Sequence, residues 1–244
     1  MQVDALAVRL RPRSPLEAAD FGVRLCQSAG RSVSGCYALA AVPALLLAAA
    51  SYQWASWLPG VVIWWLKPWL DQSILFVLSR AAFGQTTTPG DLWRARRQVW
   101  WRQLLFTLTV RRLSPWRSLT QPVYGLEGLS IRQAHGRVRQ IRRRAAGQAL
   151  LVTHAFSMAE TALTVALISL LFWLAPSGLT PTFEQVLGGG DTGAVALIVN
   201  CAYPVAALFM EPFYVAAGFA MYLNRRVELE AWDIEQELRR AFAE

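Results

Sequence analysis

Charged residues are scarce in this chain. Asp, Glu, Lys and Arg make up 16% of its 244 residues, whereas roughly 25% is usual in a soluble domain. Hydrophobic residues make up 55%, and the mean hydropathy is +0.30. A soluble protein cannot bury so many apolar side chains, because too few charged ones remain to cover its surface. The composition therefore excludes a disordered chain, a disulfide scaffold and most soluble enzymes, and it indicates a membrane protein.

Cysteine and histidine are also few, with three and two residues respectively. Cys26, Cys36 and Cys201 do not have the spacing of metal ligands, and His135 and His154 lie far apart in the sequence. We interpret the cysteines as small apolar residues and expect neither a metal site nor a disulfide framework. Because no nucleophile–base set is visible, we also expect no cofactor and no enzymatic activity.

The first thirty residues lack a short apolar core followed by a small-residue cleavage site, so we expect no secretory signal there. Four longer apolar runs follow, at residues 36–58, 61–83, 149–175 and 193–223. Each is long enough to cross a hydrocarbon core of about 30 Å, which needs about 20 helical residues. We therefore predict an all-α polytopic membrane protein with about four transmembrane helices, the last of which is tilted or broken near Pro204 and Pro212.

Basic residues are distributed very unevenly between the two sides of this predicted membrane domain. Five Arg precede the first run, fourteen lie between residues 80 and 148, and four follow residue 223, whereas the other two connections contain none. Positive residues favour the cytoplasmic side. We therefore predict a membrane protein with a cytoplasmic N-terminal segment (1–33), a membrane domain (34–223) and a cytoplasmic amphipathic helix (224–244). The charge is thus a topology signal, and we expect no nucleic-acid partner.

The long central connection contains two predicted helices. Asp91 is an expected helix N-cap, and residues 92–112 mix arginine with tryptophan, which favours an interfacial or shallow re-entrant helix. A soluble amphipathic helix is the alternative. In the second helix, at 129–147, the apolar residues Ala134, Val138, Ile141 and Ala145 share one face. We expect this helix to continue directly into the third span, with Arg137, Arg142, Arg143 and Arg144 free to contact anionic lipid or an acidic partner.

Four ionisable residues fall within the predicted spans: Lys67, Asp71, Glu160 and Glu211. A charge at that depth is costly unless it is paired, hydrated or neutralised, so these residues are candidates for an ion-binding or headgroup-binding site. Lys67 and Asp71 are one helical turn apart, and we expect them to pair. Glu160 and Glu211 then need a proton, a bound cation or an arginine from the central segment. A role as neutral packing groups remains the alternative.

Several strings together resemble a family of uncharacterised bacterial polytopic inner-membrane proteins. They are WWLKPWLD at 64–71, WWR at 100–102, RRLSP at 111–115, EPFYVAAGF at 211–219 and NRRVELEAWDIE at 224–235. Members of that family are often encoded beside a MoxR-type AAA+ ATPase, which implies partnership with such a system and with other membrane proteins. The last string is also similar to the end of glycerophosphodiester phosphodiesterase membrane domains, although that enzyme's catalytic domain has no counterpart here.

The tail beyond the fourth span has an apolar stripe of its own. Val227, Ala231, Ile234, Leu238 and Phe242 recur at helical spacing, and Arg226–Glu230 and Glu235–Arg239 are opposite charges four residues apart. Such a helix docks on other cytoplasmic helices or on a partner, and its candidate contact residues are Arg225, Arg226, Glu230, Trp232 and Asp233.

Two functions follow as expectations. The first is a non-catalytic integral subunit of a larger envelope-associated complex. The second is an ion- or proton-coupled transporter or lipid-handling protein that uses the buried carboxylates.

Overall fold

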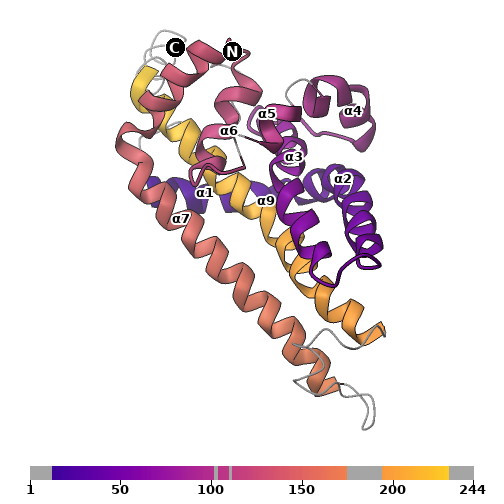
Figure 1. Cartoon of the computed structure of the whole chain (residues 1–244). Coiled ribbons are helices and arrows are strands. Elements are labelled where there is room, and N and C mark those ends of the chain that lie inside the picture. Colours follow the sequence, from indigo (N-terminus) through magenta and orange to yellow (C-terminus); the bar gives the residue numbers. More distant parts are fainter. Residues whose placement is uncertain (1–12, 102–103, 110–111, 175–193, 231–244) are drawn as a thin grey trace.

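The computed structural model describes residues 13–101, 104–109, 112–174 and 194–230, and in these ranges every regular element is a helix (Figure 1). The elements are α1 (Pro15–Ser28), α2 (Gly30–Ser51), α3 (Leu58–Ala81), α4 (Pro89–Arg94), the π-helical turn η2 (Arg97–Trp101), α5 (Leu104–Leu108), α6 (Arg117–Leu126), α7 (Ile131–Leu174) and α9 (Ala194–Glu230).

Four of these helices are long and apolar enough to cross a membrane: α2, α3, residues 132–170 of α7 and residues 197–230 of α9. The predicted all-α polytopic class with four spans is therefore confirmed. The first span begins at Gly30 rather than at residue 36 and ends at Ser51 rather than at residue 58. Its first residues, Gly30, Arg31 and Ser32, are not apolar, so hydropathy alone does not mark the start of the helix.

α9 is the central element of the bundle, and it packs against α1, α2, α3, α6 and α7. Figure 1 shows it passing diagonally through the middle of the molecule, with the long α7 running beside it. In the most apolar stretch of α9, 72% of the residues are buried, compared with 6% in α7. α9 is thus enclosed by protein, whereas α7 exposes most of its apolar surface. Despite Pro204 and Pro212, α9 is one continuous helix.

Two glycines allow α9 to approach its neighbours closely. Gly22 of α1 faces the backbone of Ala216 and Ala217, where a Cβ would lie 2.2 Å from the Ala216 carbonyl oxygen. Gly218 of α9 faces Ser118 of α6, where a Cβ would lie 2.2 Å from the Ser118 Cβ. These distances are far below van der Waals contact. The two glycines therefore fix how α1 and α6 sit on α9.

The stretch predicted as a single helix at 92–112 is instead divided into α4, η2 and α5. Thr88, not Asp91, is the N-cap of α4; Asp91 is the third helical residue and completes a capping box with Thr88. Trp100 is buried, packs against the Trp69 ring and donates a hydrogen bond to Ser73 Oγ (2.9 Å). These contacts draw the segment onto α3, and they are the reason it does not lie apart as one helix.

The second predicted cytoplasmic helix does continue into the third span, because α7 is unbroken from Ile131 to Leu174. The face formed by Ala134, Val138, Ile141 and Ala145 is buried, as its spacing predicts. At the same end of the bundle, Arg13 and Asn224 exchange two hydrogen bonds, from Arg13 N to Asn224 Oδ1 (2.8 Å) and from Asn224 Nδ2 to Arg13 O (2.9 Å). The start of α1 and the last part of α9 therefore lie side by side.

We expect Gly218→Ala to lower the thermal unfolding temperature of the detergent-solubilised protein clearly, because the added methyl group must displace α6 from α9. The matched control is Gly136→Ala in α7, where no atom lies within 4 Å of the added Cβ. That variant should unfold at the parent temperature or slightly above it, because alanine favours a helix interior by about 0.5–1 kcal/mol over glycine. Equal unfolding temperatures for both variants would contradict the α6–α9 contact.

Candidate functional site

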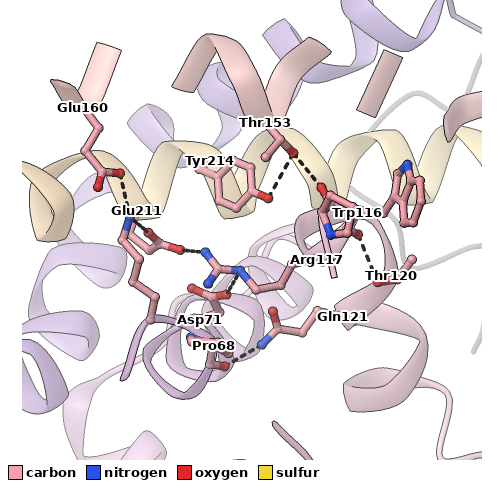
Figure 2. A network of polar contacts seen from close by, with 12 residues as sticks. Pro68, Asp71, Trp116, Arg117, Thr120, Gln121, Thr153, Glu160, Glu211 and Tyr214 are labelled. Atoms are coloured by element: carbon pink, nitrogen blue, oxygen red, sulfur yellow. Dashed lines mark hydrogen bonds and ion pairs between the residues drawn. The ribbon is translucent and has the colours of Figure 1, made fainter. Parts of the chain in front are cut away.

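The four ionisable residues of the predicted spans all belong to one network, which joins α3, α6, α7 and α9 (Figure 2). Lys67 Nζ of α3 lies 2.6 Å from Glu160 Oε2 of α7 and 3.1 Å from Glu211 Oε2 of α9. A single ammonium group therefore bridges the two carboxylates that the sequence left without a partner.

The fifth member of the network is Arg117, the first residue of α6. Its Nε lies 3.2 Å from Asp71 Oδ2, and its Nη2 donates a hydrogen bond to Glu211 Oε1. The expected pairing of Lys67 with Asp71 is therefore wrong: each of them pairs with a residue of another helix. From the sequence, Glu211 is expected to need a proton, a bound cation or an arginine from the central segment, and the structure shows the contact with the arginine. Because Glu211 accepts from both cations, it joins the two halves of the network.

Burial makes this network energetically important. Asp71 is 0% exposed, Glu211 2% and Arg117 5%. Removing one partner of a buried ion pair leaves an uncompensated charge and typically costs about 3–5 kcal/mol. The ion pairs therefore constrain the positions of all four helices at once.

Neutral hydrogen bonds hold the chain around Arg117 at this level. Gln121 Nε2 donates to the Pro68 carbonyl oxygen (2.7 Å), and Trp116 Nε1 donates to the Ala146 carbonyl oxygen (3.1 Å). Thr153 Oγ1 donates to Pro115 O (3.0 Å) and lies 3.2 Å from the Tyr214 hydroxyl. α6 and the preceding turn are thus attached to α3 and α7, and α7 is joined to α9, separately from the ion pairs.

The network forms one wall of a cavity of about 300 Å³ between α3, α7, α9 and the turn before α6. The charged lining residues are Lys67, Arg112, Arg117, Glu160 and Glu211; the hydroxyl-bearing ones are Ser114, Thr153, Ser157, Tyr203 and Tyr214. The side chains of Glu160 and Lys67 keep 14% and 9% of their surface exposed, whereas Asp71 keeps none and lies behind the wall. Groups of both signs therefore face the same space.

Arg112 is the third cation of this cavity. Its guanidinium carbon lies 3.6 Å from the centre of the Trp64 ring, and its Nε is buried with no hydrogen-bond partner among the described residues. Burial lowers the pKa of Arg112 to about 10, and the like charge of Arg117 acts in the same direction. With this pKa Arg112 stays protonated at neutral pH. The cavity and the network behind it thus contain three basic and three acidic side chains.

Burial also acts to lower the pKa of Arg117, but the carboxylates of Asp71 and Glu211 outweigh it and raise the pKa above its usual range. Its Nη1 is buried and has no hydrogen-bond partner in the part of the chain that the structure describes. The cavity is therefore lined by two guanidinium groups, which are donors, beside carboxylates that act as acceptors.

The other candidate contact residues lie at the end of the bundle where α7 begins and α9 ends. Arg137 pairs with Glu127 (3.4 Å) and with Glu230, and Arg226 pairs with Glu230 as its spacing predicts (2.7 Å). Arg225 pairs with Glu228. These three arginines and Glu230 make contacts within the chain, so their use by a partner stays a prediction. Trp232 and Asp233, with the rest of the predicted tail stripe beyond Glu230, lie outside the described residues.

The remaining three candidate arginines of the predicted lipid-contact helix make no ion pair among the described residues. Arg142 stacks on the Trp116 ring with its guanidinium carbon 3.6 Å from the ring centre, and Arg143 and Arg144 are exposed.

Sequence reasoning did not single out Arg112, Arg117, Gln121 or Tyr203. The two arginines are among fourteen in the central segment, and nothing in their spacing distinguishes them from those that face solvent. The available signal was the charge imbalance itself, because three carboxylates and one lysine within spans require further cations.

Comparison with protein-family models, with curated proteins and with solved structures gives no match for this chain. The functional argument therefore depends on the site alone.

We expect Arg117→Gln to destabilise the detergent-solubilised protein by about 3–5 kcal/mol, because it leaves two buried carboxylates without their nearest cation. Arg117→Gln combined with Glu211→Gln should cost less than the sum of the two single changes, which a double-mutant cycle on thermal unfolding measures. The control is Arg24→Gln, which removes an exposed ion pair with Asp20 (3.1 Å) and should cost at most about 1 kcal/mol. Additive effects of the two network variants would rule out the coupling.

Proposed function

We propose that this chain is a multi-pass protein of the bacterial inner membrane whose N- and C-terminal sides both face the cytoplasm. The four apolar helices and the basic residues before, between and after them support this orientation. The hydrogen bonds between Arg13 and Asn224 also support it, because they join the two ends of the described chain at one end of the bundle.

We propose further that the protein handles lipids: the charged cavity receives the headgroup of a membrane lipid as it moves between the two leaflets. The observation that carries this proposal is a cavity lined by groups of both signs within the apolar lengths of α3, α7 and α9. A headgroup in the hydrocarbon core loses its hydration, so it needs donors and acceptors from the protein.

The chemistry of the lining suits a phospholipid headgroup. Arg112 and Arg117 both line the cavity, and guanidinium groups bind phosphate oxygens through paired hydrogen bonds. Glu160 is an acceptor for an amine or hydroxyl of the same headgroup, and it keeps part of its surface exposed. The volume of about 300 Å³ is at the lower end of the range of small-molecule sites, about 300–1,000 Å³.

The position of the cavity supports access from the side of the bundle. Ser157 lines the cavity and is itself exposed on α7. α7 is the span least covered by the rest of the described chain. A lipid can therefore present its headgroup to the cavity while its acyl chains stay against the outer surface of α7.

The second proposal is a non-catalytic subunit of a larger envelope complex, one that a MoxR-type AAA+ ATPase serves, as the family resemblance implies. It is favoured by the same exposed stretch of α7, which includes the polar residue His154 among its exposed apolar residues. The two proposals differ in one respect: only the first requires the purified chain to act on lipids without a partner.

The test is reconstitution into vesicles of phosphatidylcholine and phosphatidylglycerol that contain a headgroup-labelled fluorescent phospholipid. We expect the parent protein to speed translocation of the label, measured by the fraction that a membrane-impermeant reductant quenches. Arg112→Gln and Glu160→Gln should each slow it by about tenfold or more, since a hydrogen bond to a charged group is worth about 1.5–3 kcal/mol and 1.36 kcal/mol is tenfold in rate.

Glu17→Gln in α1 and Arg24→Gln are the matched controls, because both residues are exposed and lie away from the cavity. They should translocate at the parent rate. Unfolding temperatures are measured for every variant. Arg112→Gln, whose side chain makes no ion pair among the described residues, should unfold near the parent temperature and carries the comparison if Glu160→Gln, which loses its pair with Lys67, unfolds at a lower one. Parent protein that translocates no faster than empty vesicles would refute the proposal and leave the subunit role as the better account.

A further inference from the structure

A second polar pocket lies between α5, α6 and the first third of α7. It has a volume of about 580 Å³, and Phe106, Thr120, Tyr124 and Val138 form much of its uncharged lining. The charged or titratable residues that line it are His135, Arg139, Arg142 and Arg143, all from α7.

The charge of this pocket has one sign. Among the described residues, no Asp or Glu lines it. In the described part of the chain, no carboxylate lies within 4.0 Å of the guanidinium nitrogens of Arg139, Arg142 or Arg143, whereas Arg137 on the same helix has two such partners. Three cations thus converge on one space without compensation, in contrast to the balanced network around Glu211. Such a space attracts an anion.

Arg142 is positioned for binding rather than free to move. Its guanidinium stacks on the Trp116 ring at 3.6 Å, and Trp116 is itself held by its hydrogen bond to the Ala146 carbonyl oxygen. Its Nε is buried and has no hydrogen-bond partner among the described residues. Stacking satisfies the face of a guanidinium but leaves its N–H edge for a ligand, and that edge matches two phosphate oxygens.

The pocket lies at the level expected for lipid headgroups. Arg142 precedes Glu160 by 18 residues of continuous helix, which is about 27 Å along the α7 axis at 1.5 Å per residue. Half of a hydrocarbon core of about 30 Å is about 15 Å. If Glu160 lies near the bilayer centre, a tilted α7 therefore places Arg142 beyond the hydrocarbon region, among the headgroups.

From these observations we propose that the pocket lined by Arg139, Arg142 and Arg143 binds a phosphate-bearing group. The phosphate belongs either to an anionic lipid or to a soluble phosphate ester, and both have the same recognition chemistry. This proposal does not require the function proposed above. The two cavities share only one lining residue, Ser114, and their charged residues are entirely different.

The experiment uses the full chain in mild detergent, with the apparent affinity for dioleoyl phosphatidylglycerol and for dioleoyl phosphatidylcholine measured by native mass spectrometry. We expect the parent to prefer phosphatidylglycerol. Arg142→Gln should weaken that binding about tenfold, because it removes one charge-assisted contact, and the double variant Arg139→Gln/Arg143→Gln should weaken it at least as much. Arg142→Lys keeps the charge but not the planar fork and should lie between Arg142→Gln and the parent.

The matched control is Arg144→Gln, which removes an exposed arginine of the same helix that does not line the pocket. It should bind within about twofold of the parent, because Arg144 is not part of the pocket lining. Glycerol 3-phosphate is added as a competitor: displacement of the lipid indicates a soluble phosphate ester, and failure to displace it indicates a lipid ligand. Equal phosphatidylglycerol binding by the parent, Arg142→Gln and the double variant would overturn the proposal.

These variants leave every charged residue of the central cavity intact. Loss of phosphatidylglycerol binding in Arg142→Gln therefore supports the pocket even if the parent protein shows no translocation. Conversely, translocation that depends on Arg112 and Glu160 does not support the pocket.

Discussion

The arrangement of the spans depends on one constraint: a carboxylate buried among apolar helices must be paired. Glu211 lies on α9, the most enclosed span, and it can be paired only by cations that other helices bring to it. Lys67 comes from α3 and Arg117 from α6. Because Arg117 also pairs with Asp71 and Lys67 also pairs with Glu160, satisfying one carboxylate fixes four helices. The small residues at the helix contacts serve the same arrangement, since Gly218 allows α6 to approach α9 closely.

The charges of the protein fall into three groups with different chemistry. The network around Glu211, taken with Arg112 of the same cavity, contains acidic and basic side chains in equal number, and it lies within the apolar stretches of the spans. It is therefore suited to a ligand that carries charges of both signs or to one that crosses the membrane. The group formed by Arg137, Arg226 and Glu230 is internally paired and joins the start of α7 to the end of α9. The group around Arg142 is cationic and has no carboxylate partner among the described residues, which suits an anion. The basic residues, which in the sequence are first of all a topology signal, therefore have distinct surroundings in the structure.

Much of the fold could be predicted from composition and periodicity, because hydropathy over 20 residues and the buried face of Ala134, Val138, Ile141 and Ala145 are local properties. The partners of Lys67 could not be predicted. The spacing of Lys67 and Asp71 along one helix can be read from the sequence, but the positions of Glu160 and Glu211 relative to Lys67 depend on how the helices pack. Arg117 was missed for the same reason: only the path of the chain from α4 to α6 shows which of fourteen arginines reaches the carboxylates. The division of 92–112 into three short elements depends on contacts of Trp100 with α3, which no local pattern records.

The central claim is that the turn before α6 reaches the level of Glu160 within the membrane. Leu113 lines the charged cavity and is 78% exposed, so a spin label there, in a background without the three cysteines, reports the depth of this turn. Its collision rates with oxygen and with a water-soluble nickel complex, measured in vesicles, give that depth. Labels at Met158 of α7, which is 56% exposed, and at Gln133 supply the references for the apolar stretch of α7 and for the beginning of α7. The account predicts that the Leu113 label matches Met158 to within about one helical turn, 5.4 Å. A depth that matches Gln133 would contradict it.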